Sequence, residues 1–162
     1  MYDYQFTDAN LTAWVVLSQT WTAMYKVADR KLNKIGLTPE KLDVLWACQE
    51  YAPPLTPAEI SRLVFRESQS IAGLLARMEK EGLITRVPKE KGHPFTEVKV
   101  TAKGKELSRP GIEVARSLIA RIMSALSAEE LEQLVKLIQK LRENALEELH
   151  LELLPPPQRV SS

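Results

Sequence analysis

Reactive and metal-binding side chains are scarce in this chain of 162 residues. The single cysteine, Cys48, excludes a disulfide within the chain and leaves no cysteine spacing typical of a metal site. The two histidines, His93 and His150, are accompanied by no Ser/His/Asp arrangement, no cluster of metal ligands and no glycine-rich phosphate loop. The sequence therefore predicts a protein that is not an enzyme and that has no cofactor and no metal site.

Long apolar runs are also missing. The sequence contains no stretch of about eighteen apolar residues, which is the length that a membrane-spanning helix needs. Residues 1–5 have neither the basic start nor the apolar core of a secretory signal, so we expect a cytoplasmic protein without a membrane partner. The apolar content of 44% is nevertheless enough to fill the core of one domain or of two small lobes.

Residues 56–104 hold the most informative pattern in the chain. Thr56, Pro57 and Glu59 form a capping box with proline at the first helical position, which predicts the start of a short helix. A turn follows, and a second helix is expected over residues 68–81. Two short helices in close succession indicate a helix-turn-helix.

The second of these helices has two different faces. Its apolar residues recur at helical spacing and predict a buried side: Ile71, Leu74, Leu75 and Met78. Its other side carries Gln69, Gly73, Arg77 and Lys80, with Ser70 and Ala76 at the margins. Glutamine can pair with adenine, arginine can pair with guanine, and small residues allow a close approach to DNA. An ordinary amphipathic helix with a solvated polar side is the alternative.

A predicted β-hairpin follows the two helices. Residues 83–87 and 96–100 read as strands, joined by a polar and turn-rich segment at 88–94, and Thr101 then caps a further helix. A hairpin directly after a helix-turn-helix predicts a winged helix-turn-helix, which places one helix in the major groove and the hairpin beside it. The segment 56–105 has a net charge of +4 and the rest of the chain −3, which concentrates positive charge where phosphates would lie.

The segment from Leu74 to Arg86 resembles the recognition-helix end and first wing strand of the MarR family of transcriptional regulators. Residues 98–104 resemble that family's second wing strand and the start of its next helix, and a weaker resemblance covers roughly residues 10–150. The chain departs from the family at the hairpin tip, where Gly92-His93-Pro94 stands in place of a common Asp-Arg-Arg.

The resemblance implies a mainly α fold with a small β-hairpin wing. It also implies a sequence-specific regulator of transcription that binds double-stranded DNA as a homodimer, and a repressor rather than an activator. The residues that we expect to contact DNA lie on the second helix and on the hairpin: Ser68, Gln69, Ser70, Gly73, Arg77, Lys80, Arg86, Lys89, Lys91 and His93. A winged-helix adaptor that binds protein instead of specific DNA is the alternative function.

Long helical patterns flank the winged segment. We expect helices over residues 8–35, from Thr38 to about residue 52, over residues 102–125 and from a second capping box at Ser127 to His150. Pro110-Gly111 should kink or interrupt the third of these helices.

The flanking helices set the expected domain organisation. Residues 38–101 would form the DNA-binding lobe, and residues 1–37 with 102–150 would form a helical dimerisation region. The apolar faces of the terminal helices are too wide to lie bare in water, which favours a two-fold dimer. Packing of these helices on the winged lobe within one chain is the alternative.

A small aromatic effector is a further expected partner, because members of the family commonly bind such molecules between the dimer helices and the DNA-binding lobe. Trp21, Tyr25 and Trp46 are the candidate ligand-binding residues, with Trp14 and Met123 as weaker ones. Ordinary core or dimer packing of these side chains is the alternative.

Two features remain outside this scheme. Cys48 would allow an oxidant sensor, although a cysteine on an apolar segment without a cationic neighbour is usually inert. Residues 151–162 contain three consecutive prolines and are expected to be an extended, flexible tail, with a polyproline ligand as the alternative.

Overall fold

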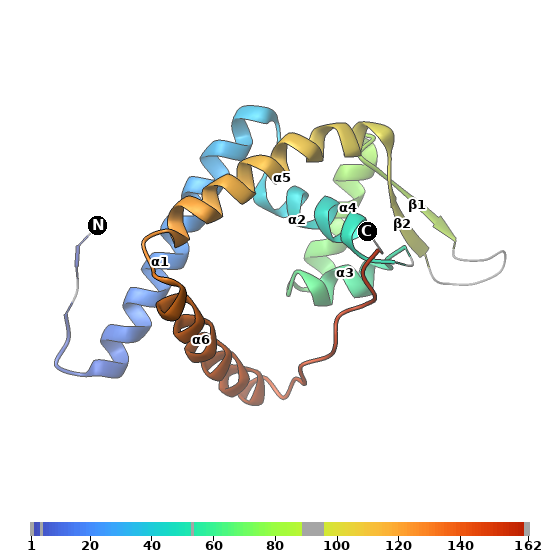
Figure 1. Cartoon of the computed structure of the whole chain (residues 1–162). Helices are drawn as coiled ribbons and strands as arrows, with labels where there is room; N and C mark the ends of the chain where they lie inside the picture. The colour runs from blue at the N-terminus through green and yellow to red at the C-terminus, as the bar shows by residue number, and fades with distance from the viewer. Residues whose placement is uncertain (1, 4, 53, 89–95, 161–162) are drawn as a thin grey trace.

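The computed structural model describes the chain except for residues 1, 4, 53, 89–95 and 161–162 (Figure 1). Its elements, in chain order, are α1 (Ala9–Leu32), a 3₁₀ turn (Asn33–Ile35), α2 (Pro39–Glu50), α3 (Pro57–Leu63), α4 (Ser68–Lys80), β1 (Ile84–Pro88), β2 (Thr96–Val100), α5 (Ala102–Met123) and α6 (Ala128–Glu148). The fold is mainly helical with one small antiparallel hairpin, which confirms the predicted fold class. No helix in the described part of the chain is both long and apolar enough to span a membrane.

The helix starts follow from the capping residues that the sequence contains. The backbone N–H of Glu59 donates to the Thr56 hydroxyl at 3.3 Å, and the Glu59 carboxylate accepts from the Thr56 N–H at 2.7 Å. Ser127 and Glu130 repeat this reciprocal pair at 3.2 and 2.8 Å. Both predicted capping boxes are confirmed, and each supplies partners for N–H groups that a helix start leaves free.

Of the two outcomes expected at Pro110-Gly111, the interruption is wrong, because α5 runs through Pro110 without a break, while the kink stays a prediction. Packing explains why the helix continues. Ser108 is fully buried, and its hydroxyl donates to the Lys105 carbonyl at 3.1 Å. A Cβ at Gly111 would lie 2.6 Å from Leu37 Cδ1, so a larger residue there would force the buried Leu37 side chain to move. The burial gained along α5 outweighs the cost of an interior proline, about 3 kcal/mol.

The core lies in the winged lobe, where α2, α3, α4 and the hairpin meet (Figure 1). Its fully buried side chains come from every one of these elements: Leu45, Ile60, Leu75, Met78, Ile84 and Val98 among them. β1 and β2 pair antiparallel, with Ile84 opposite Val100 and Pro88 opposite Thr96. The first strand therefore starts one residue later than predicted, while the second has the predicted bounds.

Candidate nucleic-acid interface

The helix α4 presents its polar side to solvent. Its four predicted apolar positions are buried, whereas Ser68, Gln69, Ser70, Arg77 and Lys80 are exposed and Gly73 is half-buried. A Cβ at Gly73 would meet only the Arg77 guanidinium, at 3.8 Å, so the surface beside it is open. The predicted division of this helix into a covered face and a free face is therefore what the structure shows.

The turn between α3 and α4 is held by hydrogen bonds from the end of α3. The Ser61 hydroxyl donates to the Arg66 carbonyl at 2.5 Å, and the Arg66 N–H donates to the Ser61 carbonyl at 3.0 Å. Phe65 has a positive φ of 50°, an uncommon conformation for a residue other than glycine, and its ring is exposed. The Ser68 hydroxyl lies 3.4 Å from that of Ser61, so the first residue of α4 belongs partly to this turn.

Arg86 is engaged in a contact that the sequence analysis did not find. Its guanidinium donates to Glu79 Oε2 from Nη2 at 2.6 Å and from Nε at 2.9 Å, and its backbone N–H donates to Glu79 Oε1 at 3.0 Å. These bonds hold the pKa of the Glu79 carboxyl below its ordinary value. Glu79 therefore ties α4 to β1, and the guanidinium of Arg86 is turned towards it. Glu79 and Arg86 are seven residues apart, on either side of the end of α4, and no known sequence motif has this spacing.

The C-terminal end of α4 is fixed by lysines from two other helices. Lys41 of α2 forms an ion pair with Glu81 at 2.7 Å, and Lys103 of α5 donates to the Glu81 carbonyl at 2.7 Å. Lysine at this position also offsets the negative end of the helix dipole. Lys89, Lys91 and His93, which we expect to contact DNA from the hairpin, lie outside the described residues.

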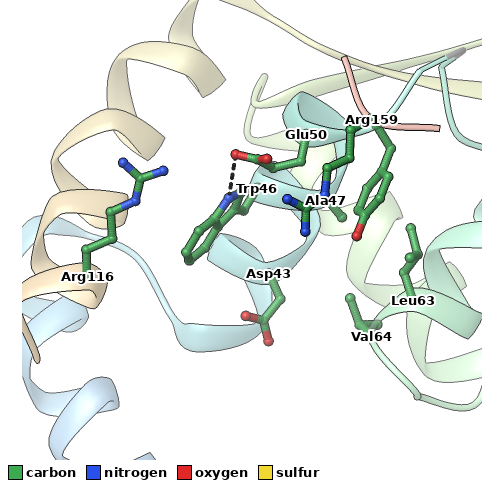
Figure 2. A pocket seen from close by; sticks show the side chains of 9 residues that line it. Asp43, Trp46, Ala47, Glu50, Leu63, Val64, Arg116 and Arg159 are labelled. Atoms are coloured by element: carbon green, nitrogen blue, oxygen red, sulfur yellow. Dashed lines mark hydrogen bonds between the residues drawn. The ribbon is translucent and has the colours of Figure 1, made fainter. Parts of the chain in front are cut away.

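An open pocket of about 570 Å³ lies on the winged lobe beside α5 (Figure 2). Its lining residues are Asp43, Trp46, Ala47, Glu50, Tyr51, Leu63, Val64, Arg116 and Arg159. The indole N–H of Trp46 donates to Glu50 Oε1 at 3.0 Å, and the guanidinium carbon of Arg116 lies 5.7 Å from the centre of the indole ring. The first four lining residues recur at helical spacing on α2, but Arg116 and Arg159 reach the pocket only through the tertiary fold.

The three candidate ligand-binding residues do not meet in this pocket, since only Trp46 lines it. Trp21 is 65% exposed on α1. Tyr25 donates a hydrogen bond from its hydroxyl to Glu40, and this bond, with partial burial, raises the pKa of Tyr25 to about 12. Of the two weaker candidates, Trp14 is exposed and Met123 is half-buried, and neither lines the pocket.

Cys48 is half-buried in α2, and burial raises the pKa of its thiol to about 12. The thiolate is the form that reacts with oxidants, so this environment works against an oxidant sensor.

Two helices leave apolar side chains uncovered. α6, all of whose residues are described, buries only Leu146 and exposes an apolar stripe of Leu131, Val135, Ile138 and Leu141. α1 exposes Leu11, Trp14, Leu17 and Trp21. Figure 1 shows α6 standing apart from the winged lobe, whereas α5 lies against α1 and α2. Within the single chain these apolar surfaces of α1 and α6 are therefore exposed to solvent.

The proline-rich tail returns to the winged lobe. The Ala52 N–H donates to the Gln158 carbonyl at 2.8 Å, and the Val160 N–H donates to the Glu50 carbonyl at 2.8 Å. Tyr51 and Arg159 form an antiparallel bridge between these two bonds. Residues 158–160 thus pair with residues 50–52 like a short strand, while the flexibility of the tail stays a prediction.

Comparison with known proteins identifies the fold. Residues 35–93 match the family model of the MarR family. The chain is similar to AbsC, a MarR family transcriptional regulator from Streptomyces coelicolor, at 19% identity and a TM-score of 0.80, covering 88% of this chain and 97% of that one. It is also similar to the organohalide-sensing regulator RdhR in its ligand-free form, at 23% identity and a TM-score of 0.79, covering 96% and 94%.

A third similar structure is that of MepR from S. aureus in a complex with DNA. Here the identity is 23%, the TM-score is 0.76, and the match covers 86% of this chain and 99% of MepR. At these identities the structures establish a common fold, and the family model adds a match in sequence over the helix-turn-helix and the first strand. The comparisons therefore show that residues 35–93 match the MarR family model and that the chain has the same fold as transcriptional regulators of that family.

Proposed function

We propose that this protein is a sequence-specific regulator of transcription that binds double-stranded DNA by placing α4 in the major groove. The observation that carries the proposal is the uncovered polar side of α4, backed by a buried apolar side and adjoined by the hairpin. An α-helix fits the major groove of B-DNA, where side chains can distinguish all four base pairs. The DNA complex of MepR, a protein with the same fold, supports this mode of binding.

The exposed residues of α4 suit different roles at DNA. Gln69 and Arg77 would read base edges, because glutamine pairs with adenine and arginine with guanine at two atoms each. Ser68, Ser70 and Lys80 would bind phosphates near the helix. Gly73 would allow the helix to approach the groove closely.

The hairpin would add phosphate contacts through Lys89, Lys91 and His93. Arg86 would brace the hairpin on α4 through its ion pair with Glu79. Its Nε and Nη2 make the bonds to Glu79, so Nη1 would be the nitrogen that contacts a phosphate.

A homodimer completes the proposal. In this arrangement residues 38–101 bind DNA, while residues 1–37 and 102–150 bring two chains together. The exposed apolar residues of α1 and α6 support this division, since a two-fold contact between like surfaces would remove them from water. Two recognition helices about 34 Å apart would match a near-palindromic site. A compact dimer on such a site would repress by covering a promoter.

The proposal includes a small aromatic effector. RdhR, which has the same fold, has been crystallised with 2,4-dichlorophenol. The pocket at Trp46 offers an aromatic wall with polar groups around it, which is typical of small-molecule sites. Such a ligand lowers DNA affinity only if it binds better to a dimer with the wrong spacing of its recognition helices.

A titration of duplex DNA at several salt concentrations tests the function. The full chain should prefer one sequence, and its affinity should fall steeply as salt rises. Protein binding releases cations from the DNA phosphates, and a higher salt concentration makes this release less favourable. Arg77→Ala should weaken binding to the preferred site by about 1–3 kcal/mol and leave random DNA less affected. Lys34→Ala, in the 3₁₀ turn after α1, is a matched control for the loss of one exposed positive charge.

The outcomes separate the possible functions. If Arg77→Ala loses the same affinity for specific and for random DNA, then Arg77 contacts only phosphate. No measurable binding at low salt would refute the proposal and favour the winged-helix adaptor.

A further inference from the structure

The turn that leads from α3 into α4 carries an exposed aromatic ring. Phe65 is 65% exposed and adopts a positive φ of 50°. A left-handed backbone is unfavourable for a residue other than glycine, because its Cβ comes too close to the following carbonyl oxygen. Neither burial of the ring nor a favourable backbone conformation therefore explains a phenylalanine at this position.

The strained turn is held by the end of α3 and by α2. The Phe65 N–H donates to the Arg62 carbonyl at 3.3 Å, and the Arg66 N–H donates to the Ser61 carbonyl at 3.0 Å. Ser61 is buried, and its hydroxyl donates to the Arg66 carbonyl. The Arg66 guanidinium forms an ion pair with Glu40 of α2 at 3.3 Å. Bonds on both sides thus fix the backbone at Phe65, and strain that is retained in this way is typical of functional sites.

The ring lies next to the residues that we expect to contact DNA. Residues 65–70 are exposed without a break, and the last three of them begin the polar side of α4. In a helix-turn-helix the N-terminal residues of the recognition helix reach the base edges. Phe65, three residues before the start of α4, is therefore at the end of this helix that enters the major groove.

The chemistry of the turn favours a base over a phosphate. Phe65 is uncharged, Glu67 is an exposed anion, and the guanidinium of Arg66 is paired with Glu40. None of these three turn residues offers a free cation to a phosphate. The major groove contains one apolar group, the C5 methyl of thymine, and phenylalanine is among the side chains that contact it. Such a contact removes apolar surface of both partners from water.

We propose that Phe65 is a specificity-determining residue that contacts the C5 methyl group of a thymine in each half of the DNA site. This inference rests on the proposed function, and it adds a base contact made by the turn rather than by α4. The bonds around Ser61 and Arg66 place the backbone of the turn before DNA arrives, so less conformational freedom is lost on binding.

Replacement of thymine by deoxyuridine tests the contact, because this change removes only the methyl group. The probe is the duplex that the full chain selects from a random-sequence library, with deoxyuridine placed at one thymine at a time. The wild type should lose about threefold to fivefold in affinity at the contacted thymine, which is the worth of one buried methyl group. Phe65→Ala should bind the thymine and deoxyuridine duplexes equally, and Phe65→Leu should keep part of the preference.

Two further variants separate this contact from other effects of the substitution. Leu153→Ala removes an apolar side chain that is 59% exposed in the tail, and it should keep the wild-type preference for thymine. Phe65→Gly places at the positive φ the residue that adopts it most readily. It should therefore melt at a temperature no lower than that of the wild type, and it should show no preference for thymine.

Three results would overturn the inference. These are a wild-type affinity that deoxyuridine changes at no position, a preference for thymine that is equal in Phe65→Ala and the wild type, and a preferred sequence whose half-sites contain no thymine. Each of them would leave the proposed regulator standing, since the protein would still bind a preferred duplex. Absence of binding to every duplex would instead refute the proposed function itself.

Discussion

Truncation of Leu141 is the most direct test of the dimer, because this side chain is the most exposed of the four in the apolar stripe of α6. It is 57% exposed in the single chain. Complete burial of a leucine side chain is worth about 1.5–3 kcal/mol, so covering the exposed part at an interface is worth about 1–2 kcal/mol in each chain. A two-fold dimer contains the residue twice.

Leu141→Ala should therefore weaken association by about 2–3 kcal/mol, which raises the dissociation constant of the dimer roughly 30- to 150-fold. The fold of each chain should be retained, since alanine is a good helix former and the position is not part of the core. Sedimentation equilibrium measures the dissociation constant, and circular dichroism checks the helix content.

Lys140→Ala on the neighbouring polar side of α6 is the matched control and should leave association unchanged. An equal dissociation constant for Leu141→Ala and the wild type would refute the use of this stripe as the dimer surface. A monomeric wild type at micromolar concentration would refute the dimer itself.

Three further predictions concern the wing, the α1–α2 contact and the cysteine. Lys89→Ala combined with Lys91→Ala should weaken binding to all DNA sequences and flatten the salt dependence by roughly one to two units, and an unchanged slope would show that the wing does not touch DNA. Tyr25→Phe should lower the free energy of unfolding at neutral pH by about 1 kcal/mol through loss of the bond to Glu40. Because the folded pKa of Tyr25 is raised to about 12, the wild type should lose this stability as pH rises from the ordinary tyrosine value through 12, and denaturant titrations of the variant should lack that decline. DNA binding by the wild type should be insensitive to peroxide, since burial keeps the Cys48 thiol protonated at neutral pH, and Cys48→Ser should bind DNA in the same way. A wild type that releases DNA on addition of peroxide, while Cys48→Ser does not, would contradict this reasoning.

Much of the winged lobe is predictable because its signals are local. In a capping box such as Thr56 with Glu59, the two residues bond to each other's backbone N–H groups. The box therefore starts a helix without help from the rest of the fold. The apolar spacing on α4 decides which of its sides is covered, and Gly82 adopts the left-handed conformation that ends the helix region.

Contacts between distant residues were not predictable in the same way. The bonds from Glu79 to Arg86 depend on the angle between α4 and β1, which no short sequence pattern encodes. The continuity of α5 through Pro110 depends on its packing against Leu37 and Leu42 at Gly111, and this tertiary burial overrides a local preference.

The sequence by itself determined the helices, the hairpin and the polar side of α4, because spacing and capping act within a few residues of the chain. Only the tertiary structure decided that Trp46 lines one pocket with Arg116 and Arg159, while Trp21 and Tyr25 lie elsewhere. It also decided that the tail pairs with residues 50–52. These contacts join segments that are far apart along the chain, and their formation depends on how whole helices pack.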